Sequence, residues 1–582
     1  MIKKLFRQML VTQIISSMTV TLCMLIDSIM IGRFLGLDAV TAYGLSAPVL
    51  LVFAALGSMI SAGVQVMCGK TMGSGDKKGT NACYSVSVTL AAAISAVGVA
   101  AVLLFTDPIC TLLGAGENVP GNEVFRLTKD YLRGFIIGAP AFIAAQIMVP
   151  YMQMSGSRSR LVGAVIAMTV GDILFDILNV FLFKMGTLGM GLASSLSYYI
   201  AFFIGVVYFF KKDCVFRFRP GLVKPAVCGK LLNAGVPTLI NQVSLVLLTF
   251  VLNKLLLSVG GNLAVAAYSV ISTAGNICYA FSTGGASVAL TLASIFFVDE
   301  DRSALKKLVS IMSSHAAVIC GAVTCGVLLG APWLVKLFIV DKSATALAVR
   351  GMRLFVLSLV PCALNTSFKN YYQGIDKVKL TMFISFMQNF LLTALSAFVL
   401  SRFLGIDGVW LGFLFGESAA LVMICGVVFI RFGRISPGAE AFSMLPEKFG
   451  VSDDKCFEVL VSDGSRVVDV AQQASEFCLK QGLTNRDSSL ISLCIEEMAN
   501  NIVKHGFRDG REHTIDVRVM ILDNAVSLRI RDNCKKFDPV KYIELHSDED
   551  PAAHIGVRMV MKMVKSANYV NSLGLNNLTL IM

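Results

Sequence analysis

Three carboxylic acids stand inside otherwise apolar stretches of this sequence, at Asp27, Asp172 and Asp176. Placing a charged side chain at the centre of a membrane helix costs roughly 2.5 to 3.5 kcal/mol, so each acid is a candidate functional residue. Asp172 and Asp176 are four positions apart in "GDILFDIL", a spacing that puts both on one face of a helix. Because two carboxyl groups this close disfavour simultaneous ionisation, the pair suits reversible binding of H+ or Na+.

A second group of polar residues lies near the C-terminal end, in "IEEMANNIVKHGF" (Ile495–Phe507). Glu497, Asn501 and His505 recur at every fourth position, which places them along one stripe of a helix. An amide oxygen such as that of Asn501 can ligate Mg2+, and a carboxylate one turn earlier can act as a general base. Taken alone, the stripe is better explained as the exposed face of an amphipathic helix.

Composition places most of the chain in a lipid bilayer. Its 582 residues are 55% hydrophobic and only 15% charged, with a mean hydropathy of +0.72, whereas about a quarter of residues are charged in soluble proteins. Twelve apolar windows have about the length that crosses a bilayer; they lie at 8–31, 45–68, 84–106, 128–153, 160–183, 188–210, 232–258, 264–297, 305–330, 349–372, 379–403 and 408–431. The sequence therefore predicts an all-α polytopic membrane protein.

The distribution of basic residues predicts the orientation of these spans. If the basic N-terminus is cytoplasmic, roughly 22 Lys and Arg residues fall on the cytoplasmic side and about 11 on the other, as the positive-inside rule requires. An even number of spans returns the C-terminus to the cytoplasm. We expect a protein of a bacterial-type inner membrane, whose net charge of +12 reflects topology and anionic lipids and needs no nucleic-acid partner.

The two halves of the membrane region look like repeats. "GRFLGLDAVTAYGLSAPV" follows the first span and "SVGGNLAVAAYSVISTAG" follows the seventh. Transporters with internal repeats place substrate and ion sites between or within their halves. We therefore expect two six-helix lobes, over residues 1–220 and 221–435.

The sequence pattern changes after about residue 431. Residues 436–455 contain turn residues and no long apolar run, as expected for a linker. Alternating segments then predict strands at "CFEVLV", "TIDVRVMIL", "AVSLRIRD" and "NLTLIM", and helices over Val467–Leu479, Asp487–His505 and "GVRMVMKMV". Residues 456–582 should form a cytoplasmic α/β sandwich domain.

Three segments of the membrane region resemble the multidrug and toxic compound extrusion (MATE) family. They are "DSIMIGRFLGLDAVTAYGLSAP", "AGVPTLINQ" and "YYQGIDKVK", within a similarity that covers about residues 1–435. The resemblance implies twelve helices in two six-helix lobes that form a V. It also implies export of a small organic cation or drug-like substrate by alternating access, coupled to H+ or Na+.

The same resemblance implies a cation site in the first lobe. The family's acids match Asp27 and Asp176, and a hydroxyl residue matches Ser194, whereas the family has Asn where this chain has Asp172. That extra acid leaves the coupling ion open, and a helix-capping or packing role remains an alternative for Asp27 and Asp172. In the second lobe the sequence offers no obvious cation carboxylate, because "PCALNTSF" is uncharged and Glu417 looks isolated.

The tail resembles the GHKL ATP-binding fold, nearest to its anti-sigma-factor serine kinase branch. "EMANNIVKH", "RDNCKKFDP" and "HIGVRMV" match, in order, the N, G1 and G2 boxes of that fold. The resemblance implies an ATP site with Asn501 as Mg2+ ligand, Glu497 as a candidate general base and Asp532 as acceptor of the adenine amino group; the other residues implied are His505, Asn533 and Gly556. Cys534 and His554 stand where the boxes usually have Gly, and their Cβ atoms predict weak ATP affinity.

Three functions fit these features. The first is an ion-coupled exporter whose cytoplasmic domain senses nucleotide or docks a regulatory protein. The second is a membrane-anchored serine kinase of the anti-sigma type that uses the transporter half as a sensor. The third is a lipid or glycan flippase of the same superfamily.

Overall fold

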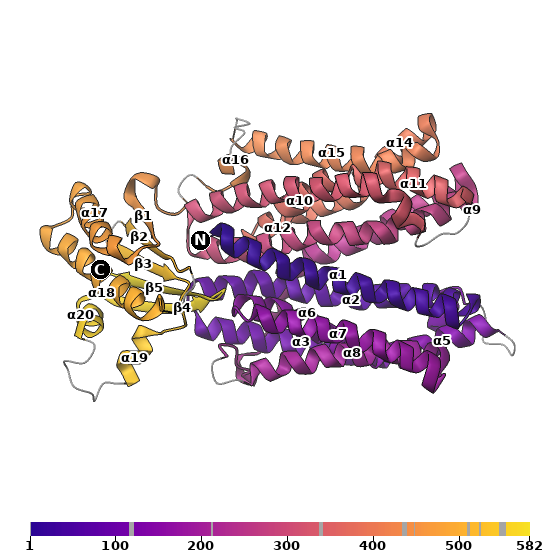
Figure 1. Cartoon of the computed structure of the whole chain (residues 1–582), viewed down its shortest axis with the longest axis horizontal. Helices are drawn as coiled ribbons and strands as arrows, with labels where there is room; N and C mark the ends of the chain where they lie inside the picture. The colour runs from indigo at the N-terminus through magenta and orange to yellow at the C-terminus, as the bar shows by residue number, and fades with distance from the viewer. Residues whose placement is uncertain are drawn as a thin grey trace.

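The chain folds into a bundle of long helices with a small sheet domain at one end (Figure 1). The computed structural model describes residues 2–115, 122–210, 214–336, 342–432, 439–446, 449–508, 512–522, 525–545 and 555–582. Within these residues, ten helices are long and apolar enough to cross a membrane, or twelve crossings result if each of two bent pairs forms one span. The predicted all-α polytopic architecture is confirmed.

The first lobe comprises the helices α1 to α8. Their bounds are α1 Ile2–Phe34, α2 Leu37–Gly73, α3 Lys77–Leu104, α4 Thr106–Leu112, α5 Glu123–Ile136, α6 Ala139–Met154, α7 Arg158–Leu178 and α8 Gly186–Phe209, with a π-helical turn η1 at Asn179–Phe183 and a 3-10 turn η2 at Pro220–Leu222. Helices α5 and α6 meet at an angle of 48° and form one of the two bent pairs.

The second lobe comprises the helices α9 to α15. Their bounds are α9 Pro225–Val298, α10 Arg302–Lys336, α11 Lys342–Val356, α12 Leu359–Gly374, α13 Val378–Phe386, α14 Thr393–Leu404 and α15 Ile406–Phe432, with a π-helical turn η3 at Met387–Leu392. Helix α9 contains two spans, because its backbone breaks at Gly261 with a φ of 64°, a conformation that favours glycine. Helices α11 and α12 form the second bent pair, at 46°.

The outer surface of the bundle is apolar, as a lipid-facing surface must be. Leu112, Phe403 and Ile430 are 87%, 80% and 85% exposed, and many other large apolar side chains are exposed on the spans. In a soluble monomer an apolar surface this extensive would be a liability. In a bilayer it contacts acyl chains, so the helices can reserve their interior for small and polar residues.

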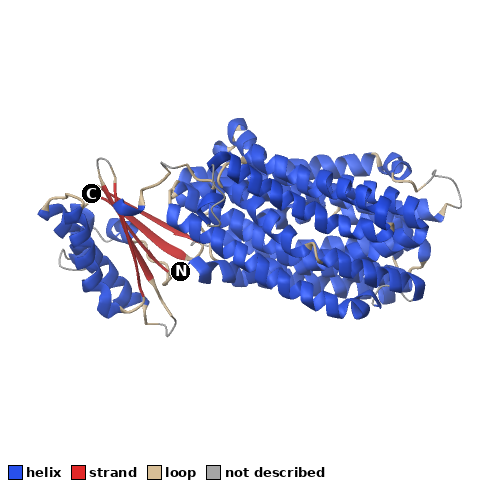
Figure 2. Cartoon of the chain, turned by 90° about the horizontal axis from the view of Figure 1, so that it is seen from above, coloured by secondary structure: helices blue, strands red, loops and turns tan. Residues whose placement is uncertain are grey.

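The sheet domain follows the short helix α16 at Ala439–Ser443. Its elements are η4 Asp453–Lys455, β1 Cys456–Val461, η5 Gly464–Arg466, α17 Val467–Lys480, α18 Asn485–Gly506, β2 Ile515–Ile521, β3 Val526–Asp532, α19 Pro539–Leu545, α20 Ile555–Met563, β4 Ser566–Ser572 and β5 Leu575–Ile581. The five antiparallel strands have the order β1-β2-β3-β5-β4. Figure 2 shows the strands between the membrane helices and the helices of the domain.

The two faces of this sheet have different partners. Val517, Ile530 and Leu580 point to one face and belong to the apolar core shared with α17 and α18. Residues of the opposite parity include Arg518, Arg529 and Arg531, which are buried although charged. Their partners lie in the membrane half of the chain, so this face of the sheet docks on the end of the bundle.

Most elements of the domain lie where the sequence predicted them, but β4 and α19 were missed. The segment "SANYVNS" of β4 carries few apolar residues, because β4 is an edge strand with one neighbour, β5. Its Tyr569 is buried and donates a hydrogen bond of 2.6 Å to Asn576 of β5. Polar cross-strand contacts thus replace the apolar alternation on which the prediction depended.

Candidate functional site

The three acids singled out from the sequence meet in the interior of the first lobe. Asp27 comes from α1, and Asp172 and Asp176 come from successive turns of α7. Their side chains are only 6%, 2% and 0% exposed, and Asp27 interacts electrostatically with both other acids. Ser194 of α8 donates a hydrogen bond of 3.3 Å from its Oγ to Asp27 Oδ2. We call these four residues the acid cluster.

The acid cluster has unused hydrogen-bonding capacity. Asp27 Oδ1, Asp172 Oδ1 and both carboxyl oxygens of Asp176 are buried without a hydrogen-bond donor among the described residues. A buried carboxylate that lacks a donor or a counter-charge is strongly unfavourable. The cluster can therefore remain buried only if protons or a cation neutralise part of its charge.

Other side chains around the acids were not predicted from the sequence. Asp172 also interacts with Cys23 of α1 and Ser197 of α8. Tyr43, Tyr131 and Tyr198 lie within electrostatic reach of Asp27. Because these tyrosines come from α2, α5 and α8, no local spacing in the sequence connects them, and only the quoted segment around Tyr43 gave any signal.

A π-helical turn fixes the end of α7 beside the acid cluster. Turn η1 begins three residues after Asp176, and Asn179 within it is buried. The Asn179 side chain donates to Gly186 O at 3.0 Å and accepts from Met185 N at 3.1 Å. The amide therefore ties the end of α7 to the start of α8. Such turns are frequent at functional sites, and this one holds two helices of the cluster in register.

The second lobe does not repeat the acid cluster. When "AVTAY" at residues 39–43 is aligned with "AVAAY" at 264–268, Leu252 takes the place of Asp27. The sequence had suggested that Glu417 is isolated, but in the structure it has polar partners. Its carboxylate accepts hydrogen bonds from Asn365 Nδ2 at 2.8 Å and from Gln388 Nε2 at 3.0 Å.

A buried lysine completes this second polar group. Lys369 of α12 donates a hydrogen bond to Asn241 Oδ1, which also accepts from Asn389 Nδ2 at 2.6 Å. Lys369 interacts electrostatically with Glu417. We call Glu417, Lys369 and their amide partners the amide-capped pair. Glu417 was noticed in the sequence, but Lys369 was missed because it is one basic residue in an otherwise ordinary span.

In the sheet domain, the predicted stripe lies on helix α18. Thr484 caps this helix by accepting a hydrogen bond of 3.1 Å from Asp487 N. Ile491, Cys494, Ile495, Met498 and Ala499 are buried on the face toward the sheet. Glu497 and Asn501 are half-buried on another face and His505 is exposed, so the polar stripe predicted from the sequence is present.

The three box-like segments converge on this stripe. Gly556, at the start of α20, lies against the Glu497 carboxylate so closely that any side chain at position 556 would overlap it. Asp532 at the end of β3 is 4% exposed, and its Oδ1 accepts hydrogen bonds from Asn576 Nδ2 at 2.9 Å and from Cys534 N at 2.8 Å. Burial raises the pKa of Asp532, although these two donors oppose the shift.

Two further residues of the boxes depart from the expected pattern. Asn533 accepts from Thr514 N at 2.8 Å and donates to Glu512 O at 3.2 Å, so its side chain supports the backbone before β2. Cys534 packs against the end of α18, where a Cβ added at Gly506 would lie 2.8 Å from the Cys534 Cβ. His554 lies outside the described residues.

The arrangement fits the residue types that Mg-ATP requires. Asn501 offers an amide oxygen suited to Mg2+ and Glu497 offers a carboxylate suited to a general base on one face of α18, and the buried Asp532 carboxylate can accept from an adenine amino group. Among the described residues, no group of three or more His, Cys, Asp or Glu side chains is placed to hold a metal ion by itself. Nucleotide phosphates would have to supply further Mg2+ ligands, as is usual for this ion.

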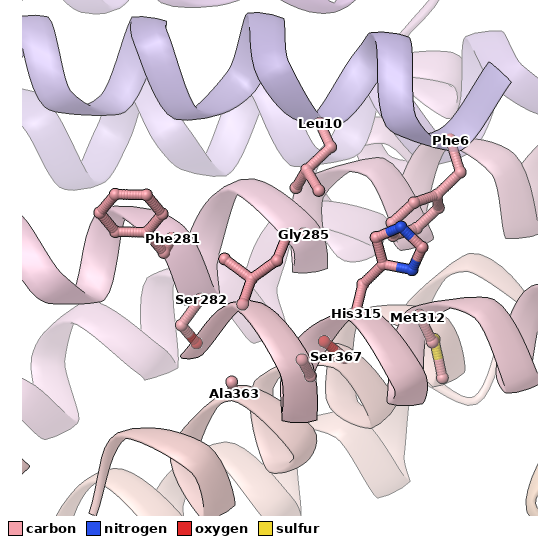
Figure 3. Close-up of a pocket in the computed structure, with 11 residues that line it drawn as sticks. Phe6, Leu10, Phe281, Ser282, Gly285, Met312, His315, Ala363 and Ser367 are labelled. Atoms are coloured by element: carbon pink, nitrogen blue, oxygen red, sulfur yellow. The ribbon is translucent and has the colours of Figure 1, made fainter. Parts of the chain in front are cut away.

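A small cavity lies between the lobes (Figure 3). Ser282, His315 and Ser367 reach it from the second lobe, and Phe6 and Leu10 of α1 close it from the first. Its volume is about 10 Å³, enough for about one water molecule. A drug-sized molecule needs a cavity of several hundred Å³, so this cavity cannot receive one without movement of the lobes.

Two family models match the chain. The MatE model matches residues 13–178 and 237–399, and the model described as histidine kinase-like ATPase domain matches residues 460–582. The first match includes all members of the acid cluster except Ser194, and the second includes all three box-like segments.

Characterised proteins and solved structures resemble the membrane half. The multidrug export protein MepA of Staphylococcus aureus (strain bovine RF122 / ET3-1) is 21% identical over 399 residues, which cover 68% of this chain and 87% of MepA. MepA of Staphylococcus saprophyticus is 20% identical over 399 residues, which again cover 68% of this chain and 87% of MepA.

Two solved structures share the fold. One is the outward-facing conformation of a multidrug resistance MATE family transporter, with a TM-score of 0.67, 20% identity and coverage of 72% of this chain and 94% of that one. The other is the Vibrio cholerae MATE transporter VcmN, with a TM-score of 0.68, 16% identity and coverage of 72% and 95%.

Proposed function

The chain belongs to the MatE family, and from this premise we propose that it exports small organic cations or drug-like molecules by alternating access, driven by H+ or Na+. The observation that carries the coupling is the acid cluster, where four carboxyl oxygens are buried without a donor among the described residues. The multidrug export proteins that resemble the chain support the class of substrate.

The acid cluster supplies a means of coupling. Binding of a proton or cation to Asp27 and Asp176 removes repulsion between buried carboxylates and favours close packing of α1 against α7. Release of that ion restores the repulsion and favours hydration of the cluster. Since a ligand shifts a conformational equilibrium by its difference in affinity for the two states, ion binding can drive the exchange between outward- and inward-facing lobes.

Flux measurements in liposomes test this proposal. The purified chain would be reconstituted with a fluorescent organic cation, and efflux would be driven by an imposed pH or Na+ gradient. Efflux should require the gradient and should stop in Asp27→Asn, whereas Asp38→Asn, which alters an exposed acid of α2, should leave it unchanged. Gradient-independent flux, or equal flux in both variants, would contradict ion coupling through the cluster.

For the sheet domain we propose regulatory binding of Mg-ATP. Two contacts support an ATP site: Gly556 lies against Glu497, and Cys534, two residues after Asp532, packs against the end of the helix that carries Asn501. Cys534 stands at a position where glycine normally lets the backbone approach the nucleotide, so we expect weak affinity and slow turnover. Asn501 would ligate Mg2+, which would neutralise phosphate charge when bound.

Calorimetric titration of the full-length protein in detergent tests the ATP site. We expect weak binding of Mg-ATP that is lost in Asn501→Ala and in Asp532→Ala. Lys480→Ala, which changes an exposed side chain at the end of α17, is the control and should bind as the unmodified protein does. No binding at millimolar ATP would reduce the domain to a docking module for a cytoplasmic protein. Rapid phosphorylation of a serine on a partner protein would instead support the kinase function.

A further inference from the structure

At the end that carries the sheet domain, the two lobes are in close polar contact. Gln65 of α2 accepts hydrogen bonds from two residues of α9, at 2.9 Å from Ser294 to its backbone oxygen and at 3.1 Å from Thr291 to its side chain. Gln13 of α1 donates to Ser287 of α9 at 3.0 Å. Lys70 of α2 pairs with Asp376 after α12. The end predicted to be cytoplasmic is therefore closed between the lobes.

The sheet domain is anchored to the second lobe by buried charges. In the turn between α9 and α10, Asp301 pairs with Arg518 and with Arg529, whose Nη1 lies 2.7 Å from Asp301 Oδ2. Asp299 pairs with Arg531 at 2.8 Å. All five side chains are almost fully buried. We call this set the Asp–Arg network.

The Asp–Arg network is electrically balanced. Asp516 adds a third acid, 3.3 Å from Arg529 Nη2, so three carboxylates face three guanidinium groups. Burial opposes ionisation of Asp301, but the charges of Arg529 and Arg518 outweigh it and lower its pKa. A lowered pKa stabilises the folded state at neutral pH, and this contribution is lost only when the pH falls through the lowered value. Removing one partner would leave a buried charge uncompensated.

Contact with the first lobe is made differently, through the hairpin between β4 and β5. Leu573 N donates to Met154 O at 2.5 Å, at the end of α6. Gly574 lies against the following turn, where a Cβ at Gly156 would be 2.7 Å from the Gly574 Cα. On β4, Val570 packs against the turn after α2, 2.9 Å from a Cβ placed at Gly75. None of these hairpin contacts involves a charge. The domain also reaches the first lobe through an ion pair of 3.4 Å between Lys4 of α1 and Glu512, whose side chains are exposed, so this pair adds little to the attachment.

The two attachments thus differ in kind. The Asp–Arg network pairs six charged groups that are buried and little screened by salt, whereas the hairpin touches the first lobe through backbone, amide and apolar atoms that water can replace. From this difference we propose that the sheet domain is a brace. It stays fixed to the second lobe and holds the closed end of the transporter shut by docking the β4–β5 hairpin on the first lobe, and this end opens only when the hairpin releases.

The brace can be tested by the accessibility of the contact between the lobes. Thr291→Cys places a thiol in that contact, at a position that is fully buried. In inside-out vesicles, a membrane-impermeant maleimide would reach this thiol only when the closed end opens, and the chain without the substitution corrects for its native cysteines. The measurement uses neither substrate nor ATP, so its outcome is independent of the proposed transport and nucleotide sites.

Two variants remove the hairpin dock separately. Leu573→Asp puts a charge on a side chain that is 2% exposed, in an apolar cluster with residues of α1 and α9. Val570→Asp acts on the first-lobe contact alone and alters the edge strand, where folding of the domain is less sensitive. Each should raise the labelling rate about fivefold or more. This is the change expected when the free energy that favours the closed end over the open end falls by roughly 1 kcal/mol. Val468→Asp changes an exposed valine of α17, in the helix layer on the opposite side of the sheet, and should have no effect.

A change at the anchor provides the second arm. Asp301→Asn should raise the same labelling rate, because a domain released from the second lobe can no longer bridge the lobes. Unchanged labelling in monodisperse Val570→Asp and Asp301→Asn proteins, or an equal increase in Val468→Asp, would overturn the brace.

Discussion

In the first lobe, three buried acids face one another with four carboxyl oxygens lacking a donor among the described residues. In the second lobe, the buried Glu417 carboxylate accepts from two amides and has the Lys369 charge nearby. Both groups bury charge inside apolar helices, but among the described residues only the acid cluster leaves carboxyl oxygens without a donor; the unpartnered atoms of the second group are the neutral amide oxygens of Asn365 and Gln388. The comparison indicates that a buried charge already satisfied by its neighbours holds helices together, whereas an unsatisfied one has capacity for an ion that comes and goes.

The largest expected effect comes from neutralising the acid cluster. Asp27→Asn and Asp176→Asn each remove a titratable charge at nearly constant volume, so we expect ion-driven efflux to fall to the level of empty liposomes while membrane insertion and thermal stability persist. Flux assays and thermal unfolding in detergent measure the two properties. Efflux at the unmodified rate in both variants would remove the distinction between the lobes.

The opposite pattern is expected for the amide-capped pair. Glu417→Gln turns an acceptor of two amide donors into a group that brings a further NH2, so charge-assisted hydrogen bonds worth about 1.5 to 3 kcal/mol should be lost. Transport should stay within about threefold of the unmodified rate while the apparent unfolding temperature falls by several degrees. A transport defect without loss of stability would assign the pair an active role in coupling.

A double substitution sharpens this result. Lys369→Met alone leaves Glu417 without its nearby positive charge, and Glu417→Gln alone leaves Lys369 without a counter-charge. The double variant removes both charges, so its loss of stability should be smaller than the sum of the single losses. Strictly additive losses in thermal unfolding would show that the two side chains act independently.

The smallest effect is expected from Asp172→Asn. This change gives the acid cluster the residue that the MATE resemblance implies at that position, and Asp27 and Asp176 remain. We expect export to continue, with a shifted dependence on pH or on Na+ concentration. Efflux measured across a series of pH values and Na+ concentrations would detect the shift, and complete inactivity would show that all three acids are required.

Local patterns predicted most of the elements but few of the tertiary contacts. The twelve windows follow from the length of apolar runs, and most elements of the sheet domain follow from periodicity; both depend only on neighbours in the chain. Asn241, the hydrogen-bond partner of Lys369, is 128 residues away in the sequence. No local signal connects the two residues. In "SLRIRD", the alternation that identified β3 places Arg529 and Arg531 on the polar face of the strand, which a sequence reader expects to be exposed to solvent. Their acids, Asp299 and Asp301, lie in a short turn that reads as an ordinary loop.

The acid cluster was easier to identify because its members are anomalous on their own. A carboxylate in an apolar span is conspicuous whatever its partners, so Asp27, Asp172 and Asp176 could be named without knowing that α1 packs on α7. Tyr43, Tyr131 and Tyr198 surround them but are unremarkable in a membrane helix, and were missed.

The Asp–Arg network also determines what a fragment of this protein would do. The sheet domain produced alone, without the membrane helices, would lack Asp299 and Asp301. Its Arg518, Arg529 and Arg531 would then face water, and Asp516 would be the one acid of the network that remains. Guanidinium groups clustered in this way attract phosphates and polyanions without selectivity. Such a fragment would adsorb ATP, nucleic acids and acidic lipids on a surface that the intact protein keeps covered, so its nucleotide affinity would combine a genuine site with an artificial one.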